Sequence, residues 1–452
     1  MTARAAASAA VGAARGLTRP IRTPRVPRLA YALFALYAVV LPWPNNVAIP
    51  RAWRLLVYNV RPYAVVAFVG IFLVGGVLTN SWRLRRVVRD PRTVRLAQLS
   101  LVFPALFLLS GFARGSLQTK VLGLYASWSL FVFVVMPALV RTRREVFILA
   151  TTLAVVLGGN WLFAALFQRA PAAQLLSEEA ARMSFSYSNP NYYSQLLQVT
   201  AALCVLAYVA RPPRSRRRLF WLGVVAGIQL VALVFVLLAR SRNVLVFMLA
   251  AGFVFLTLRR PRVQVWAAML GLVVTVFVGG LLISGMDRAV VDQAASGRLS
   301  LWGSWIDALN HSGDPLTSWL FGNQRAGGVG LASYDELHAS KEFVKFHVDN
   351  FYLEHLVESG LLGLGALLWP RIVLMLRGAR RLAHEPARPA VAWVLAFHAG
   401  ILAQGMFYAT FPSFNAPAAF TLATLGLAPL LVDWNEPPRG PARGHRAGPV
   451  AA

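Results

Sequence analysis

Apolar segments long enough to cross a lipid bilayer recur along most of the chain, and they restrict the fold more than any other feature. A transmembrane helix needs about 20 consecutive, mostly apolar residues. Of the 452 residues, 57% are hydrophobic and 14% are charged, whereas roughly 25% of the residues in a soluble domain are charged. Because lipid offers no hydrogen bonds to an exposed backbone, segments of this length must be helical. The sequence therefore predicts an all-α, polytopic integral membrane protein.

The apolar segments predict about twelve transmembrane helices of roughly 17–25 residues each. The expected spans are residues 29–44, 62–79, 96–113, 121–140, 146–167, 193–210, 219–239, 243–258, 264–285, 351–376, 390–409 and 416–432. Together they define one membrane domain, residues 29–432. The basic arm at 1–28 and the tail at 433–452 have compositions typical of disordered segments.

The net charge of +28 reflects how basic residues are distributed among the loops. Most of the 45 lysines and arginines lie in alternate predicted loops, which include 80–95, 211–218, 259–263 and 371–389. Short loops rich in Lys and Arg remain in the cytoplasm, so we expect both termini to be cytoplasmic. The same residues can contact anionic membrane lipids. The basic clusters lie outside any nucleic-acid recognition motif, so we expect no nucleic acid as a partner.

Potential metal ligands are sparse. Cys204 is the one cysteine in the sequence, which excludes an internal disulfide and a cysteine metal cluster. Asp335, Glu336, His338 and His347 are close in sequence, but their spacing matches no zinc motif. We therefore expect neither a metal nor another cofactor.

Two predicted outer loops are long, at 168–192 and 286–350. Loops of more than about 12–15 residues are usually functional or disordered. The second loop, between the ninth and tenth spans, is expected to be partly helical. It contains RLSLWGSWIDAL, which places a stripe of apolar residues on one helix face: Leu299, Trp302, Trp305, Ile306 and Leu309. Such a helix either lies at the membrane–water interface or packs on the bundle as a lid, and the pattern fits both alternatives.

The outer end of the tenth span is unusually polar. The stretch HVDNFYLEHLVESGLLGLGALL, residues 347–368, is apolar enough for lipid only in its second half. A charged side chain near the bilayer centre costs about 2.5–3.5 kcal/mol on insertion scales, so such groups usually mark a function. Asp349 and Asn350 are also residue types that cap helix N-termini.

Further along the same stretch, Glu354 and Glu358 are four residues apart and share one helix face. The two acids of a glycosidase lie across the scissile bond instead. We therefore interpret Glu358 as hydrogen-bonded inside the bundle or as orienting an arginine. Gly360 and Gly363 would then permit close helix packing.

Several outer-side motifs resemble, in their order, the O-antigen ligase and O-antigen polymerase superfamily. They are N-P-N at 189–191, S-R-N at 241–243, S-G-R at 296–298 followed by the tryptophan segment, WLFGN at 319–323, and D-N-x-Y-L-x-x-x-x-E-x-G-x-x-G at 349–363. The resemblance covers most of the chain and is densest between about 186 and 369. No single motif is specific, and the order of the motifs carries the resemblance.

The resemblance implies a metal-independent, inverting glycosyltransferase of the bacterial inner membrane, active at its periplasmic face. The expected donor is a glycan linked to undecaprenyl pyrophosphate. The acceptor is a hydroxyl of a lipid core or another carrier in a ligase, and of a second lipid-linked repeat in a polymerase. A transporter or flippase for lipid-linked saccharides is the alternative, and a structural membrane protein without chemistry is a further one.

Departure of a pyrophosphate develops negative charge, which an enzyme without a metal must stabilise with fixed cations. Arginine offers a planar, bidentate fork for phosphate. We therefore predict that Arg242 and Arg298 hold the pyrophosphate. Arg240 either shares that role or extends towards the interface. From charge alone, Arg298 could equally lie on a solvated helix face.

His347 is the expected general base, because its unperturbed pKa lies near neutrality. The ligases of the family are expected to have a histidine directly before the asparagine, whereas this chain has Asp349 before Asn350. Asp349 is therefore the alternative base, and the difference favours a polymerase. We expect Asn191, Asn350 and Glu358 to support the site, and the N-P-N that contains Asn191 is similar to a feature of the family.

Overall fold

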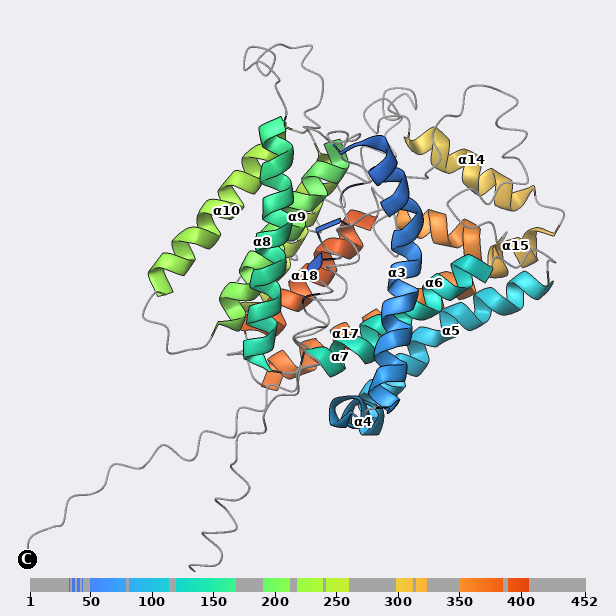
Figure 1. Ribbon diagram of the computed structural model, residues 1–452. Coiled ribbons are helices and arrows are strands. Elements are labelled where there is room, and N and C mark those ends of the chain that lie inside the picture. The colour runs from blue at the N-terminus through green and yellow to red at the C-terminus, as the bar shows by residue number, and fades with distance from the viewer. Residues whose placement is uncertain are drawn as a thin grey trace, which may run out of the picture.

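The computed structural model describes residues 49–78, 81–113, 119–140, 142–167, 190–211, 218–238, 241–259, 298–311, 314–322, 350–384 and 389–405, with a few single residues between 32 and 43. Regular structure in these segments is entirely helical, as Figure 1 shows, which confirms the all-α class. The expected spans 264–285 and 416–432, the arm and the tail lie outside the described residues, as does more than half of 29–44.

The described helices follow the apolar segments of the sequence. They are α3 (Arg51–Leu78), α4 (Trp82–Arg89), α5 (Pro91–Ala113), α6 (Thr119–Leu130), the π-helical η2 (Phe131–Val135), α7 (Met136–Leu139), α8 (Arg143–Phe167), α9 (Pro190–Ala210), α10 (Arg218–Leu238), α11 (Arg242–Arg259), α14 (Arg298–Asn310), α15 (Pro315–Phe321), α17 (Phe351–His384) and α18 (Pro389–Gly405).

Several helices are long and apolar enough to cross a membrane. Four are continuous, at Pro91–Phe112, Arg143–Phe163, Leu219–Val236 and Phe351–Leu382. A fifth arises if α3 and α4 are taken together across their 96° bend. The remaining apolar helices, in α6–α7, α9, α11 and α18, are shorter. The described part of the chain is therefore compatible with a membrane protein that has four or five long spans.

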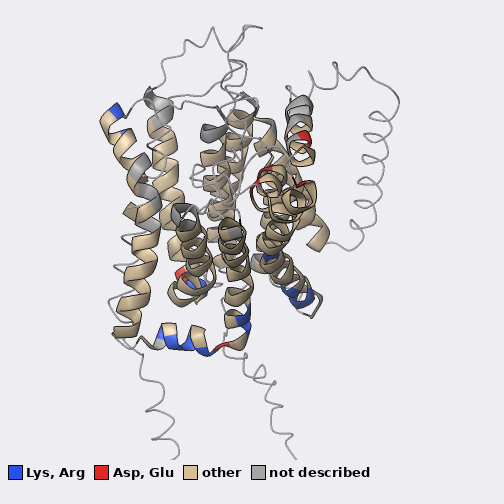
Figure 2. Ribbon diagram, turned by 90° about the vertical axis from the view of Figure 1, so that its right-hand side faces the viewer, with Lys and Arg blue, Asp and Glu red and all other residues tan. Residues whose placement is uncertain are grey.

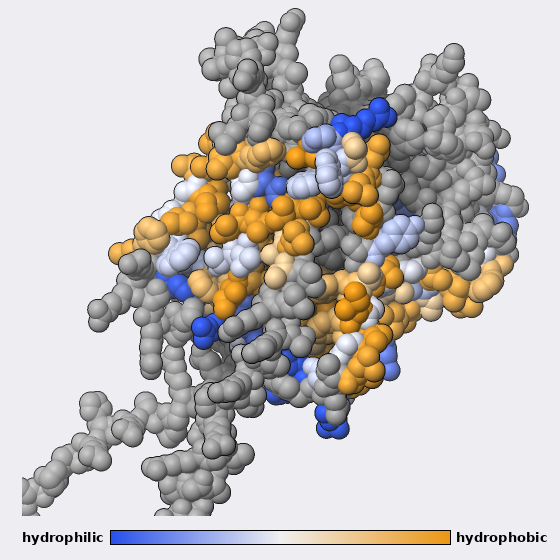
Figure 3. All heavy atoms as spheres, viewed as in Figure 1, coloured by the Kyte–Doolittle hydropathy of each residue, from blue (hydrophilic) through white to orange (hydrophobic). Residues whose placement is uncertain are grey.

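The helices pack around α9, α17 and α18. In one part of the bundle α9 contacts α8 and α10, and in another α17 contacts α5, while α18 contacts α9, α11 and α17. The buried core is aliphatic and aromatic and includes Phe131, Leu153, Leu203 and Phe397. Large hydrophobic side chains also cover the outside of α3, α5, α8 and α10 (Figure 3), as expected where helices face lipid.

Most exposed arginines gather at one end of the bundle, although Arg51, which begins α3, is exposed at the other end. Figure 2 shows them on α4 and on the helix ends beside it. Arg86, Arg89, Arg92 and Arg95 are exposed there. α14 lies towards the opposite end (Figure 1). Among the described residues, the basic end and the predicted outer loop helix are thus separated along the bundle.

The tenth expected span differs from its prediction in two respects. α17 continues to His384, although the sequence analysis placed an inner loop from residue 371 onwards, and Arg371 is buried inside the bundle. Hydropathy marks where lipid ends, whereas a helix can continue beyond that point. The helix is also interrupted at Gly360, which has φ 69° and ψ −175°. A left-handed φ of this kind is easily adopted only by glycine.

Candidate functional site

The C-terminal half of α18 joins α9 and α11 within the bundle. Gly400 leaves no room for a side chain, because a Cβ there would lie 2.8 Å from the Phe247 ring of α11. On another side, the amides of Gln404 and Gln198 exchange two hydrogen bonds of 2.9 Å each. Both glutamines are buried, so this reciprocal pair satisfies polar groups that would be costly alone.

The same part of α18 also contacts the first turn of α17. The Tyr352 hydroxyl donates a 2.6 Å hydrogen bond to the carbonyl oxygen of Leu402. A Cβ at Gly405 would lie 3.3 Å from the Phe351 side chain. The N-terminal parts of α9, α11 and α17 therefore meet around one element.

Asn350 caps α17. Its side-chain oxygen accepts hydrogen bonds from the backbone N–H groups of Tyr352, at 3.0 Å, and Leu353, at 3.1 Å. Its backbone carbonyl accepts from the Glu354 N–H at 2.9 Å. The capping interpretation of Asn350 is thus confirmed. The cap fixes where the helix begins next to the expected catalytic loop.

Glu358 lies in a buried polar cluster between α6 and α17. Its Oε2 accepts a 2.8 Å hydrogen bond from the Tyr125 hydroxyl and lies 3.0 Å from His355 Nδ1. The three side chains are all buried, and the rings of Phe103 and Phe107 pack edge-on against Tyr125. A carboxylate in such surroundings needs partners. These contacts agree with the interpretation that Glu358 bonds inside the bundle.

Two of the sequence motifs meet beside this cluster. Gly322 ends the WLFG segment with φ 70°, and Gly360 interrupts α17 with φ 69°. A Cβ on Gly360 would overlap the carbonyl group of Leu320, and one on Gly322 would overlap that of Glu358. Gly360 thus permits close packing as predicted, but its partner is the short loop helix α15. The contact requires a backbone conformation that the sequence analysis did not predict.

The α14 helix packs on the start of α17. Trp305 and Leu309 form a buried cluster with Leu353 and Val357, and Trp302 and Trp319 lie against it. The apolar stripe of the loop helix therefore faces the bundle, as the lid alternative expects, although Ile306 stays exposed. The Trp319 indole N–H also donates a 2.9 Å hydrogen bond to the Asn310 side chain, which joins α15 to α14.

The predicted catalytic and binding residues are described to different extents. Asn191 lies in the first turn of α9, and Arg242 and Arg298 begin α11 and α14, in each case with the backbone described but not the side chain. Arg240, His347 and Asp349 lie outside the described residues. Two of these helix starts, those of α9 and α11, thus belong to elements that pack on α18.

Several buried polar residues of this region were not predicted. Tyr125 lies in an apolar span with no polar neighbour in sequence, although a buried tyrosine usually has a hydrogen-bond partner. Gln198 likewise precedes a long apolar run. Within the described ranges, no group of three His, Cys, Asp or Glu side chains is placed to hold a metal ion.

No family model matches the chain, and no curated protein matches it.

Proposed function

We propose that this protein is a glycosyltransferase of the bacterial inner membrane that polymerises or ligates a glycan carried on undecaprenyl pyrophosphate. In this proposal it crosses the membrane about twelve times, with both termini in the cytoplasm. The reaction takes place at the periplasmic face, to which the 286–350 loop is assigned.

One observation carries the proposal: Gln198 of α9, Phe247 of α11 and Tyr352 of α17, each in the N-terminal half of its helix, all contact the C-terminal half of α18. Three helix N-termini at one end of the bundle favour a phosphate group there. Three motifs of the resemblance span these helix starts, and they contain Asn191, Arg242 and Asn350. A lipid-linked pyrophosphate is the anion that suits such a position at the edge of a membrane.

The proposed roles follow from the chemistry of transfer. Arg242 and Arg298 hold the pyrophosphate and neutralise the charge that develops as it leaves, and Arg240, two residues before Arg242, shares this role. The acceptor hydroxyl attacks the anomeric carbon opposite the pyrophosphate and loses its proton to His347 or Asp349. The carbon–oxygen bond to the pyrophosphate breaks, and undecaprenyl pyrophosphate departs with the electron pair. Asn350 and Glu358 support the site by fixing the start and the bend of α17.

A gel profile of surface glycan from a strain without the gene tests the proposal. Single repeat units on the normal carrier indicate a polymerase. Full-length chains that accumulate on the undecaprenyl carrier indicate a ligase. An unchanged profile of both lipid-linked and surface glycan contradicts the proposal and favours the transporter or structural alternatives.

Arginine variants then test the mechanism. Arg242→Ala and Arg298→Ala should abolish product while folded protein remains in the membrane, because the leaving group loses its fixed cations. Arg89→Ala, at the basic end, is the matched control and should keep full activity. Full activity of the Arg298 variant would refute the assigned mechanism.

A further inference from the structure

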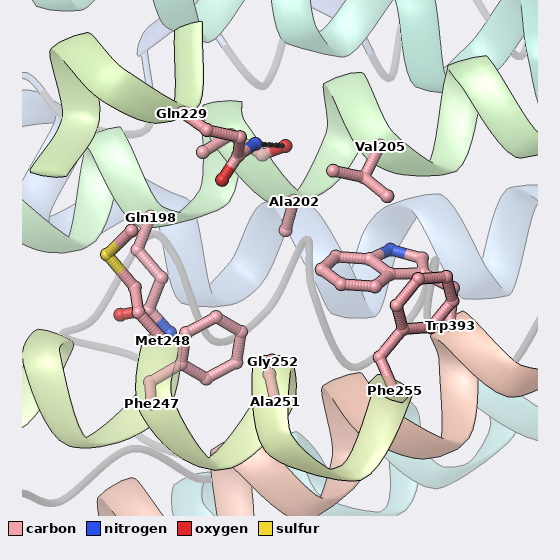
Figure 4. A pocket seen from close by; sticks show the side chains of 11 residues that line it. Gln198, Ala202, Val205, Gln229, Phe247, Met248, Ala251, Gly252, Phe255 and Trp393 are labelled. Carbon is pink, nitrogen blue, oxygen red and sulfur yellow. Dashed lines mark hydrogen bonds between the residues drawn. The ribbon is translucent and has the colours of Figure 1, made fainter. Parts of the chain in front are cut away.

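A pocket of about 240 Å³ lies between α9, α10, α11 and α18. It shares Gln198 and Phe247 with the packing of α9 and α11 on α18 described above, and it contains none of the predicted catalytic or pyrophosphate-binding residues. Figure 4 shows its lining side chains turned towards a common space. One wall is aromatic, with Phe247 and Phe255 of α11 and Trp393 of α18. The opposite wall is formed by the small side chains Ala201 and Ala202 of α9.

The chemistry of the lining excludes most ligands. It contains no charged residue, and its two amides are already hydrogen-bonded. Gln198 pairs with Gln404, and the Gln229 side-chain N–H donates a 2.8 Å hydrogen bond to the Ala201 carbonyl oxygen. A buried water needs about two to four polar partners, which this pocket does not supply. Its lining therefore suits a hydrocarbon.

The size of the pocket also suits a hydrocarbon. An enclosed apolar cavity of roughly 150 Å³ stays dry and takes up benzene. This pocket is larger and partly open, so a long chain can enter it. A Cβ on Gly252, which lines the pocket, would meet no atom within 4 Å. Side chains around an empty space lose dispersion contacts that a bound chain would restore.

The surroundings of the pocket identify the occupant. α10 is the least buried of the four long apolar helices, and it presents Leu230 and Val234 outwards. The neighbouring α11 presents Leu249 and Phe253 in the same way. Two of the helices that line the pocket, α10 and α11, thus have outer faces that suit bilayer lipid. The hydrocarbon available beside such faces is the acyl chain of a lipid.

We propose that this pocket binds one acyl chain of a bilayer phospholipid, which fills the space between α10 and the α11–α18 pair. The headgroup has no partner in the lining, so the site selects the chain and not the headgroup. This inference does not depend on the proposed glycosyltransferase activity.

Photolabelling tests the proposal. The full-length protein is reconstituted in phospholipid nanodiscs that contain a phosphatidylcholine with a diazirine in its acyl chain, irradiated, and mapped by mass spectrometry. Peptides from α11 and α18 that line the pocket should be labelled. Gly252→Trp should reduce this labelling roughly tenfold, because a filled, close-packed site has no room for the chain. The matched control is Gly227→Trp on α10, where a new side chain also meets open space and which does not line the pocket.

Two results would overturn the proposal. One is equal labelling of the Gly252→Trp and Gly227→Trp proteins. The other is labelling by a diazirine-bearing polyprenyl phosphate but not by the phospholipid probe, which would assign the pocket to an isoprenoid chain. Ala202→Phe fills the pocket from α9 and replaces Gly252→Trp if that variant does not fold.

Thermal unfolding in detergent gives a second readout. Added phospholipid should raise the Tm of the wild-type protein and of Gly227→Trp, because a ligand that binds the folded state stabilises it. The rise should be lost in Gly252→Trp. An equal rise in all three proteins would contradict a specific site.

Discussion

At the residue scale, the carboxylate of Glu358 connects two helices of the site region, α6 and α17. It is 3% exposed and lies among aromatic rings, where an isolated charge would be strongly disfavoured. Tyr125 and His355 both approach the same oxygen atom, Oε2. Tyr125 belongs to α6 and His355 to α17, so the carboxylate joins two helices. Glu358 is therefore hydrogen-bonded inside the bundle, as the sequence analysis interpreted it, and it connects α6 with α17.

The first prediction concerns this connection. Tyr125→Phe removes the hydroxyl donor and leaves the buried carboxylate with one partner fewer, which should lower the free energy of unfolding by about 1–3 kcal/mol. Thermal unfolding in detergent measures the change. Tyr208→Phe, on the half-buried face of α9, is the control and should be nearly neutral.

A double-mutant cycle separates the hydrogen bond from simple loss of packing. If the bond carries the effect, Tyr125→Phe should cost much less in a Glu358→Gln background than in the wild type. Equal costs in the two backgrounds would show that the 2.8 Å contact contributes nothing to stability.

At the element scale, the bend of α17 is the feature that places the loop helices. Beyond Gly360 the helix packs along α5, and before it the helix lies under α14 and α15. The Ser110 hydroxyl of α5 donates a 3.1 Å hydrogen bond to the Phe321 carbonyl oxygen, which holds the end of α15 at the bend. The bend thus gives one helix both a membrane-facing part and a part that supports the lid.

The second prediction tests this bend. Gly360→Ala forces a Cβ into the carbonyl group of Leu320 and a residue with a side chain into a left-handed conformation. The conformation alone costs about 1–3 kcal/mol, and the collision adds to it. The Tm should fall, and α14–α15 should become sensitive to limited proteolysis.

Gly365→Ala is the matched control in the same helix. Nothing lies within 4 Å of a Cβ there, and alanine favours a helix over glycine by up to about 1 kcal/mol. This variant should be as stable as the wild type or more so. Similar losses in both variants would mean that the bend is not what holds α15.

The elements show which features a sequence can predict and which it cannot. α8, α9 and α10 begin and end within a few residues of their expected spans, because arginines and prolines flank their apolar segments. The stripe of Trp302, Trp305 and Leu309 was predicted from its spacing and packs on the bundle. The bend at Gly360 was not predicted, because it depends on a contact with α15, which is distant in sequence. The same holds for Tyr125 and Glu358, which are separated by 233 positions.

At the scale of the whole molecule, the exposed arginines are unevenly distributed along the bundle. The exposed arginines of α4 and the start of α5 lie at one end, and α14 lies towards the other (Figures 1 and 2). Arg83 is the exception among the α4 arginines, since it is buried and forms a 2.8 Å ion pair with Glu145 of α8. That pair anchors the basic end to the bundle.

The third prediction concerns orientation. In a Cys204→Ala background, a cysteine at Asp307 of α14, which is exposed, should react with a membrane-impermeant maleimide added to spheroplasts. A cysteine at Arg89 should react only after the membrane is permeabilised, because Arg-rich segments stay in the cytoplasm. The opposite pattern would invert the topology, and labelling of both from outside would rule out a bilayer between them.

The interlocked glycines also have a mechanical consequence. Since Leu320 lies against Gly360 and Glu358 against Gly322, α15 cannot slide along α17 without unpacking the bend. A displacement of α15 therefore strains the backbone next to Glu358. Because the Glu358 carboxylate accepts a hydrogen bond from Tyr125, this strain reaches α6 as well. A movement of α15 would thus change the surroundings of the buried Tyr125–Glu358 hydrogen bond through the contact between Gly322 and Gly360.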